Sequence, residues 1–268
     1  MPELPEVETT VRGLAHFLDG ATITRAVTNR PDMRRPFPPD LVQTLTGATV
    51  TGLGRRAKYG LIHMNRERSL IFHLGMSGRW RIDPERIEKH DHLVIETVDH
   101  RFALCDPRRF GSVDLVASDL LKRWPPFAAM GPEPLGPALT AHHLHTSFAG
   151  RRQAIKLMLL DQRFVAGLGN IYVCEALYRA HISPLKPAGK VSLALKRLVP
   201  AIRGVLEEAI AAGGSSLRDY ARPDGELGYF SKQFDVYGRE SEPCPCGGTI
   251  RRITQGGRST WYCPKCQR

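Results

Sequence analysis

Four of the six cysteines of this 268-residue chain fall within its last 25 residues. They form two close pairs, Cys244 with Cys246 and Cys263 with Cys266, and sixteen residues separate the pairs. Four thiolates suit a tetrahedral structural Zn²⁺, because protein groups then fill every coordination position. The two pairs can meet only if the chain between them turns back on itself. The spacing therefore predicts one zinc ion and a ribbon-like hairpin over residues 239–268.

The first half of the chain has the pattern of a β-rich domain behind a short helix. Apolar and β-branched runs recur at strand spacing with Gly, Asp and Asn between them, at residues 21–27, 70–74, 93–98, 102–105 and 113–116. This pattern predicts a sandwich or a barrel. Five prolines then crowd residues 125–137, where a continuous helix or a central strand is disfavoured. We place the first domain boundary there, so that the N-terminal domain covers residues 1–130.

The pattern becomes helical from Thr140 onward. Apolar residues recur every three or four positions in residues 151–162, 169–180 and 191–214. Pro200 is expected to kink or break the third helix, and Gly213 and Gly214 are expected to end it. Residues 215–242 show no clean period and are interpreted as a long surface loop. The fold class is therefore α+β, with a helical domain at 131–238 and the cysteine-rich module at 239–268.

The chain carries 38 Lys and Arg against 27 Asp and Glu, a formal charge of +11. Such a surplus favours a polyanionic partner such as nucleic acid, although a basic surface that only aids solubility is the alternative. Residues 239–268 contain six basic and two acidic residues, so the cysteine-rich module is expected to contact phosphates. The start of the chain is acidic, unlike a signal peptide, and no run reaches the roughly 18 apolar residues of a membrane helix. We expect a cytoplasmic protein without a membrane partner.

Pro2 is the strongest candidate for a chemically reactive group in this sequence. Removal of Met1 would leave it as a free secondary amine, and an α-amino group titrates near pH 7.7 to 8.0, so part of it is neutral and nucleophilic at physiological pH. A secondary amine that condenses with an aldehyde-level carbon gives a permanently cationic iminium, which favours β-elimination. Glu3 lies next to it. The alternative is structural, because Pro and Glu are both favoured in the first turn of a helix.

Seven segments, in order from the first residue to the last, closely resemble those of bacterial formamidopyrimidine-DNA glycosylases. The segments are MPELPEVETTVRGL, GRRAKYGL, HLGMSGRW, KHDHL, DPRRFG, GLGNIYVCEALYRAHISP and GRSTWYCPKCQ. The resemblance implies an N-terminal β-sandwich with flanking helices, a helix-two-turns-helix domain and a zinc finger. It implies a monomeric, bifunctional repair enzyme that binds damaged double-stranded DNA, removes oxidised purines and cleaves the abasic strand by β,δ-elimination.

The same resemblance assigns roles to residues that match the family's motifs. Pro2 matches the nucleophile, Glu3 the general acid and base, Lys58 a lysine that transfers protons during β-elimination, and Arg258 a finger arginine linked to δ-elimination. DNA contacts are implied for His90, Arg108, Arg151 and Asn170. Met76 and Phe110, with Arg108, match the residues that fill the void when a base leaves the stack, which a duplex enzyme needs because the stacked base hides C1′.

One feature departs from the family pattern. The family's finger opens with two residues between its first cysteines, whereas here Pro245 is the single spacer. Pro245 has no N–H to donate to a sulfur, so a distorted or weaker zinc site is one hypothesis. Two alternative functions stay open: an endonuclease VIII-like glycosylase for oxidised pyrimidines, and a non-catalytic DNA-binding protein built on the same modules.

Overall fold

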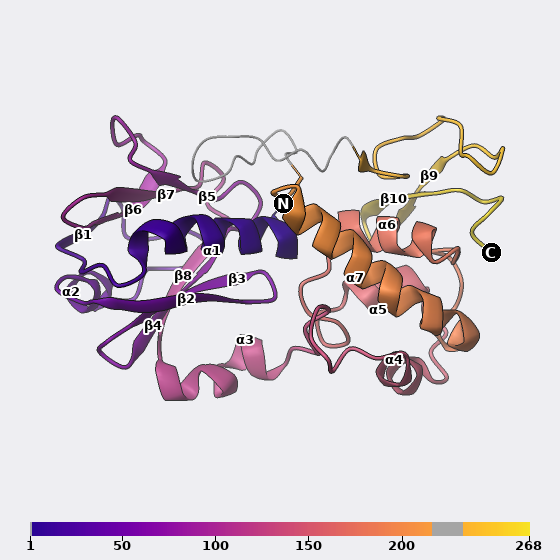
Figure 1. The fold of residues 1–268 in the computed structure, drawn as a ribbon, viewed down its shortest axis with the longest axis horizontal. Coiled ribbons are helices and arrows are strands. Elements are labelled where there is room, and N and C mark those ends of the chain that lie inside the picture. Colours follow the sequence, from indigo (N-terminus) through magenta and orange to yellow (C-terminus); the bar gives the residue numbers. More distant parts are fainter. Residues whose placement is uncertain (1, 216–232) are drawn as a thin grey trace. The chain divides into compact units, whose positions relative to one another are not determined.

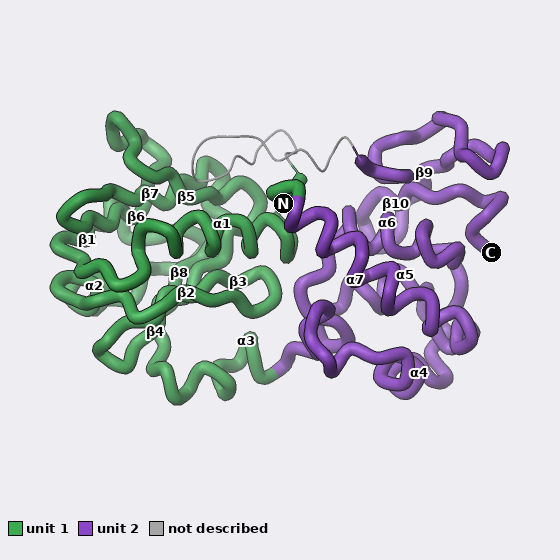
Figure 2. The backbone as a smooth tube through the Cα atoms, viewed as in Figure 1, with its two compact units in different colours: residues 1–128, 212–231 green, residues 129–211, 232–268 purple. Residues whose placement is uncertain are grey.

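The computed structural model describes residues 2–215 and 233–268. The chain divides into two compact units (Figure 2), one of residues 1–128 with 212–231 and the other of residues 129–211 with 232–268. Most of the loop expected at 215–242, namely residues 216–232, lies outside the described residues, as does Met1.

The first unit is built on two four-stranded antiparallel sheets (Figure 1), with strand orders β1-β6-β7-β5 and β2-β3-β4-β8. The strands are β1 (Arg25–Thr28), β2 (Val50–Arg56), β3 (Tyr59–Met64), β4 (Arg68–His73), β5 (Arg79–Ile82), β6 (Asp91–Glu96), β7 (Arg101–Cys105) and β8 (Ser112–Ala117). The predicted sandwich is confirmed. Strands β2, β3 and β5 went unpredicted, because glycines and arginines interrupt their apolar pattern and pairing with neighbours is what makes them strands.

The core of this unit lies between the sheets and helix α1 (Leu4–Leu18). Val7, Val11 and Leu14 recur at helical spacing along one face of α1 and belong to the same buried cluster as residues of both sheets. Phe72 from one sheet meets Trp80 from the other edge to face, with ring centroids 5.6 Å apart. Three short helical segments complete the unit: α2 (Leu41–Leu45), η1 (Ser118–Arg123) and α3 (Pro125–Ala128). The core fixes the direction in which α1 presents the N-terminus.

The second unit contains the predicted helices. They are α4 (Ala141–Phe148), α5 (Ile155–Leu160), α6 (Asn170–Arg179) and α7 (Leu195–Ala211), with 3₁₀ turns η2 (Ala188–Lys190) and η3 (Ser192–Ala194). Of the kink or break expected at Pro200, the break does not occur, since α7 runs through it. Pro200 stands six residues into the helix on its exposed side, where the carbonyl that it leaves unbonded can face water. Gly213, at φ 77°, follows the end of α7 as expected.

The C-terminal module is a β-hairpin of β9 (Arg251–Gln255) and β10 (Arg258–Tyr262). Gly256 and Gly257 form its two-residue turn with φ of 54° and 72°, the left-handed backbone that a type I′ turn requires. The hairpin predicted between the cysteine pairs is thus present. The turn places Arg258 at the first position of the returning strand.

Candidate functional site

The N-terminus is fixed by a reciprocal pair of hydrogen bonds. Pro2 is buried and directly precedes Glu3, the N-cap of α1. The Glu3 N–H donates to Glu6 Oε2 at 2.9 Å, and the Glu3 side chain accepts from the Glu6 backbone in a capping box. Glu6 Oε1 also accepts from the N–H and the hydroxyl of Ser215, at 2.8 and 2.9 Å. Pro2 and Glu3 therefore occupy one defined position at the start of α1.

Lys58 lies in the two-residue turn between β2 and β3 and is 9% exposed. Its neighbour Ala57 has φ 53°, as such a turn requires. Arg55 donates to the Ala57 carbonyl at 2.9 Å and to Glu8 of α1 at 2.8 Å. Burial raises the pKa of Glu8, but Arg55 and Arg12 bring that pKa below its ordinary value, so Glu8 is a carboxylate. The turn that carries Lys58 is thus tied to the helix that begins at Pro2 and Glu3.

His73 is a neighbour of Lys58 that the motif comparison did not single out. Burial and, to a smaller extent, the nearby charges of Lys58, Arg34 and Arg35 together lower the pKa of His73 to about 4. The Gly75 N–H donates to His73 Nδ1 at 3.0 Å. A neutral ring that accepts at Nδ1 carries its proton on Nε2, so His73 offers an N–H donor there.

Met76, Arg108 and Phe110 come from two loops that pack backbone against backbone. A Cβ on Gly75 would lie 2.4 Å from the carbonyl carbon of Phe110, so only glycine permits this approach. Phe110 is 44% exposed, and the Arg108 guanidinium lies 4.9 Å from the centre of its ring. The structure therefore brings together the residues predicted to fill the void left by a flipped base.

Asp106 has no exposed surface. Its side chain accepts hydrogen bonds that stabilise the loop carrying Arg108 and Phe110. It accepts from the Ser77 hydroxyl at 2.7 Å and from the Gly111 N–H at 2.8 Å. Its own N–H donates to the His90 carbonyl at 2.9 Å. This hydrogen bond connects the backbone at His90 to the loop that carries Arg108.

In the second unit, Asn170 and Arg258 are brought together through Ser259. Asn170 is the first residue of α6, and its Nδ2 donates to the Ser259 carbonyl at 2.9 Å. Lys156, which is fully buried, donates to the same carbonyl at 3.0 Å and to the Thr260 hydroxyl at 2.6 Å. Hydrogen bonds therefore attach the strand that begins with the exposed Arg258 to the helices, and one of these bonds comes from the Asn170 amide.

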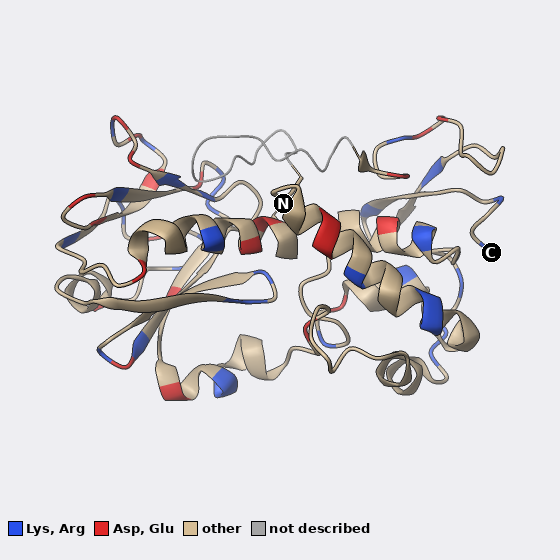
Figure 3. Ribbon diagram, viewed as in Figure 1, with Lys and Arg blue, Asp and Glu red and all other residues tan. Residues whose placement is uncertain are grey.

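Arg151 lies apart from that contact. It is exposed, and its guanidinium carbon lies 5.8 Å from the centre of the Phe164 ring. Lys and Arg residues occur over both units (Figure 3), so the positive charge is not confined to the C-terminal module.

The four predicted zinc ligands converge. Their sulfur atoms all lie within 4.8 Å of one another, with Cys244 and Cys266 3.9 Å apart and Cys246 and Cys263 3.5 Å apart. Four sulfurs bound tetrahedrally at about 2.3 Å are separated by roughly 3.8 Å, so the geometry fits zinc. A Cβ on Gly248 would lie 2.9 Å from Cys263 Sγ, so the turn needs glycine to close around the sulfurs.

The protonation of these thiols also fits a cation site. Burial raises the pKa of Cys244, but hydrogen bonds from Tyr178 and from the Cys246 backbone N–H bring it down to about 7. Burial and neighbouring sulfurs raise the pKa of Cys246 and of Cys266. Four thiolates this close repel one another unless a cation lies among them, and Zn²⁺ bound there would hold the finger hairpin as a structural clamp.

Comparison with known proteins identifies the family. Residues 1–113 match the model of the formamidopyrimidine-DNA glycosylase N-terminal domain, residues 130–221 that of the family's H2TH domain, and residues 241–268 a zinc finger found in FPG and IleRS. The chain belongs to the formamidopyrimidine-DNA glycosylase family. It is 71% identical to the formamidopyrimidine-DNA glycosylases of Erythrobacter litoralis and Novosphingobium aromaticivorans, with all of each chain covered.

Solved structures of the family agree with this fold. A Lactococcus lactis FPG mutant in complex with a Fapy-dG containing DNA matches at a TM-score of 0.92 and 35% identity, over all of both chains. The L. lactis Fpg in complex with an abasic-site containing DNA matches equally well, at a TM-score of 0.92. Membership of this family makes the chain a DNA glycosylase of base excision repair with a sheet domain, an H2TH domain and a zinc finger. Within residues 2–215 and 233–268, no helix has the length and apolar character needed to cross a membrane.

Several residues that organise these sites were not predicted from sequence. Glu175 on α6 is fully buried and accepts the backbone N–H groups of Asp235, Val236 and Tyr237 at 2.8, 3.0 and 2.8 Å. Lys156 and Glu175 did leave a signal, since each is a charged residue within an otherwise apolar helical run. A buried charge must have partners, so such positions point to contacts that the periodicity alone does not name.

Proposed function

We propose that this glycosylase is bifunctional, removing oxidised purines such as 8-oxoguanine and formamidopyrimidines and then cleaving the strand at the abasic site. The observation that supports the proposal is that hydrogen bonds connect the helix behind Pro2 and Glu3 to the turn that carries Lys58. Arg55 donates these hydrogen bonds. The solved relatives with Fapy-dG and abasic-site DNA support this class of substrate.

Each step of the proposed reaction is assigned to a named residue. With Met1 removed, the Pro2 nitrogen attacks C1′ of the damaged nucleotide, the N–C1′ bond forms, and the glycosidic bond breaks with its electron pair leaving on the base. The nitrogen loses its proton and the C1′–O4′ bond breaks with its electron pair on O4′, which is protonated, so that an iminium forms and acidifies C2′–H. Loss of that proton expels the 3′-phosphate in β-elimination, and a second elimination expels the 5′-phosphate. Glu3 and Lys58 transfer the protons, and Arg258 assists the second elimination.

Binding to double-stranded DNA needs a separate set of residues. Flipping the nucleotide costs a few kcal/mol, and we assign its compensation to Met76, Phe110 and Arg108, which fill the void and face the orphaned base. His90, Arg151, Asn170 and Arg258 are assigned to the DNA backbone, with Asn170 acting in part by holding the strand of Arg258. We propose that the enzyme works as a monomer in the cytoplasm, where bacterial DNA lies.

We assign these roles to three domains. Residues 1–130 form the catalytic domain, residues 131–238 the helical domain with its lesion-side loop, and residues 239–268 the finger. Cys244, Cys246, Cys263 and Cys266 hold one structural zinc ion, as the sulfur distances support. In this role the ion keeps the hairpin folded so that Arg258 is presented in one orientation.

Borohydride trapping tests the covalent step. The enzyme with a free N-terminus is expected to form a stable adduct with DNA that contains 8-oxoguanine. The matched control keeps an uncleaved N-terminal extension, which converts the Pro2 amine to an amide, and it is expected to form none. A non-catalytic DNA-binding protein would bind the duplex without any adduct in either form. Faster trapping on oxidised pyrimidines than on oxidised purines would instead support the endonuclease VIII-like alternative.

Arg258 has its own test. Arg258→Ala is expected to weaken duplex binding and to shift the products from β,δ- towards β-elimination, as resolved by gel analysis of the cleaved ends. Arg251→Ala is the control, because Arg251 is an exposed arginine on the partner strand of the same hairpin. An unchanged product ratio in Arg258→Ala would contradict the assignment.

A further inference from the structure

The first cysteine pair of the finger lies in a tight turn. Cys244 to Gly247 form a β-turn in which the Gly247 N–H donates to the Cys244 carbonyl at 2.8 Å. Proline is favoured at the second position of such turns, which Pro245 occupies. Because Pro245 has no N–H, the single spacer of this pair donates no hydrogen bond to the Cys244 sulfur.

A tyrosine of α6 reaches the same sulfur from outside the finger. The Tyr178 hydroxyl oxygen lies 3.3 Å from Cys244 Sγ. Cys174, one helical turn earlier, belongs to the same buried cluster as Cys244 and Cys263, against which Tyr178 packs. Cys244 is 5% exposed and Tyr178 is partly buried, so the contact is partly shielded from water.

The direction of this hydrogen bond follows from the chemistry of the ligand. A cysteine bound to zinc is a thiolate and has no proton to donate. The Tyr178 hydroxyl must then be the donor, and a donor to an ionised acceptor in a site with little water makes a strong bond. Groups that hydrogen-bond to metal ligands orient those ligands, and their loss typically reduces metal affinity by roughly 10–100-fold.

We propose that Tyr178 is a positioning residue of the zinc site, whose hydroxyl donates a hydrogen bond to the Cys244 thiolate from helix α6, outside the shortened Cys244–Cys246 turn. The proposal rests on zinc binding by the four cysteines, and it is independent of which lesions the enzyme removes. The helical domain thereby becomes part of the metal site.

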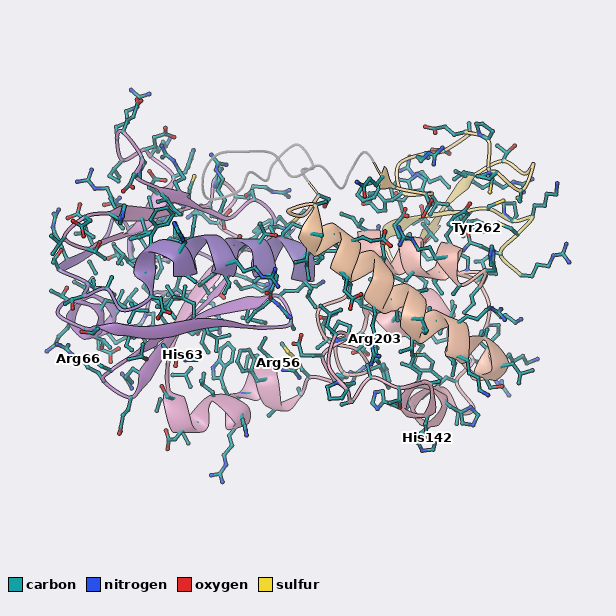
Figure 4. The ribbon with its side chains drawn as sticks, viewed as in Figure 1. Arg56, His63, Arg66, His142, Arg203 and Tyr262 are labelled. Carbon is teal, nitrogen blue, oxygen red and sulfur yellow. The ribbon has the colours of Figure 1, made fainter. Side chains whose placement is uncertain are left out.

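Zinc release by the full-length protein tests this proposal. Tyr178→Phe removes one oxygen atom and keeps the ring. Zinc-loaded Tyr178→Phe is expected to release its metal to a chromogenic chelator on the order of tenfold faster than the wild type. Tyr262→Phe is the matched control (Tyr262 is labelled in Figure 4), because Tyr262 is a buried tyrosine directly before the ligand Cys263. It is expected to release zinc at close to the wild-type rate.

Cobalt substitution separates this bond from a general loosening of the fold. A hydrogen bond to a thiolate lowers the energy of the sulfur electrons. Its loss should move the sulfur-to-cobalt charge-transfer absorption of Tyr178→Phe to longer wavelength, with the band of Tyr262→Phe unmoved. An unshifted band together with wild-type zinc release in Tyr178→Phe would overturn the proposal. So would a wild-type protein that folds and binds neither metal, and in that case the trapping experiment on Pro2 would still report independently on the glycosylase.

Discussion

Arg55 donates to the Glu8 carboxylate at 2.8 Å and, from the same guanidinium, to the Ala57 carbonyl at 2.9 Å. One side chain thus joins helix α1, whose N-cap Glu3 directly follows the proposed nucleophile, to the turn that carries Lys58. Catalytic groups must be held within about 0.5 Å of their working positions. The Arg55 hydrogen bonds would help to hold the proposed catalytic groups in such positions.

Arg55→Met is therefore expected to slow borohydride trapping by about tenfold to a hundredfold, because the Lys58 turn loses its link to α1. The loss of unfolding free energy is expected to be about 1 kcal/mol. Arg12→Met is the matched control, since Arg12 bonds to the same carboxylate at 2.8 Å but its side chain is 66% exposed. Equal trapping rates for the two variants would show that the link does not position Lys58.

Glu6→Gln is expected to lower the unfolding free energy by about 1–3 kcal/mol, because an amide NH₂ would face donors that a carboxylate oxygen now accepts. Those donors include the Glu3 and Ser215 N–H groups. Ser215→Ala removes only a hydroxyl from the same contact and is expected to cost less. Urea denaturation of both variants measures the difference. A larger loss in Ser215→Ala than in Glu6→Gln would contradict the central role of the carboxylate.

The half-buried His73 is expected to make stability depend on pH. Its folded-state pKa of about 4 lies below the ordinary value of 6.5, so the unfolded chain binds more protons between these two values. The unfolding free energy should therefore fall as pH drops from about 6.5 to about 4, by on the order of 3 kcal/mol from this group. His73→Asn should show a shallower decline, measured by urea denaturation across this range. His16→Asn, at an exposed position on α1, is the control, and parallel profiles for both variants would contradict the assignment.

Replacing Gly204 and Gly60 by alanine is expected to change the unfolding free energy in opposite directions. Gly204 lies within α7, and a Cβ there would come no closer than 3.9 Å to Glu208, so Gly204→Ala should raise the unfolding free energy by about 0.5–1 kcal/mol. A Cβ on Gly60 would lie 2.1 Å from the buried Phe72 ring, so Gly60→Ala should lower it by about 1–3 kcal/mol. Thermal unfolding of both variants checks the pair. Destabilisation by Gly204→Ala would contradict the packing of α7.

Much of the fold could be predicted from local patterns. The apolar runs of β4, β6, β7 and β8, the helical period of α6 and the glycines after α7 each mark an element through residues close in sequence. Strands β2, β3 and β5 and the course of α7 through Pro200 were exceptions. A proline breaks a helix only if the loss of one hydrogen bond exceeds the packing of the rest, and α7 buries an apolar face on both sides of it.

By itself, the sequence determined the local chemistry of this protein: two cysteine pairs able to share one metal ion, a proline that can become a terminal amine, and motifs that match a single family. The tertiary structure decided which groups meet. Arg55 with Glu8, Lys156 with Ser259 and Tyr178 with Cys244 are 47, 103 and 66 residues apart. No local period encodes such pairs, because they depend on how whole sheets and helices pack. Burial in that packing then sets the protonation of residues such as His73.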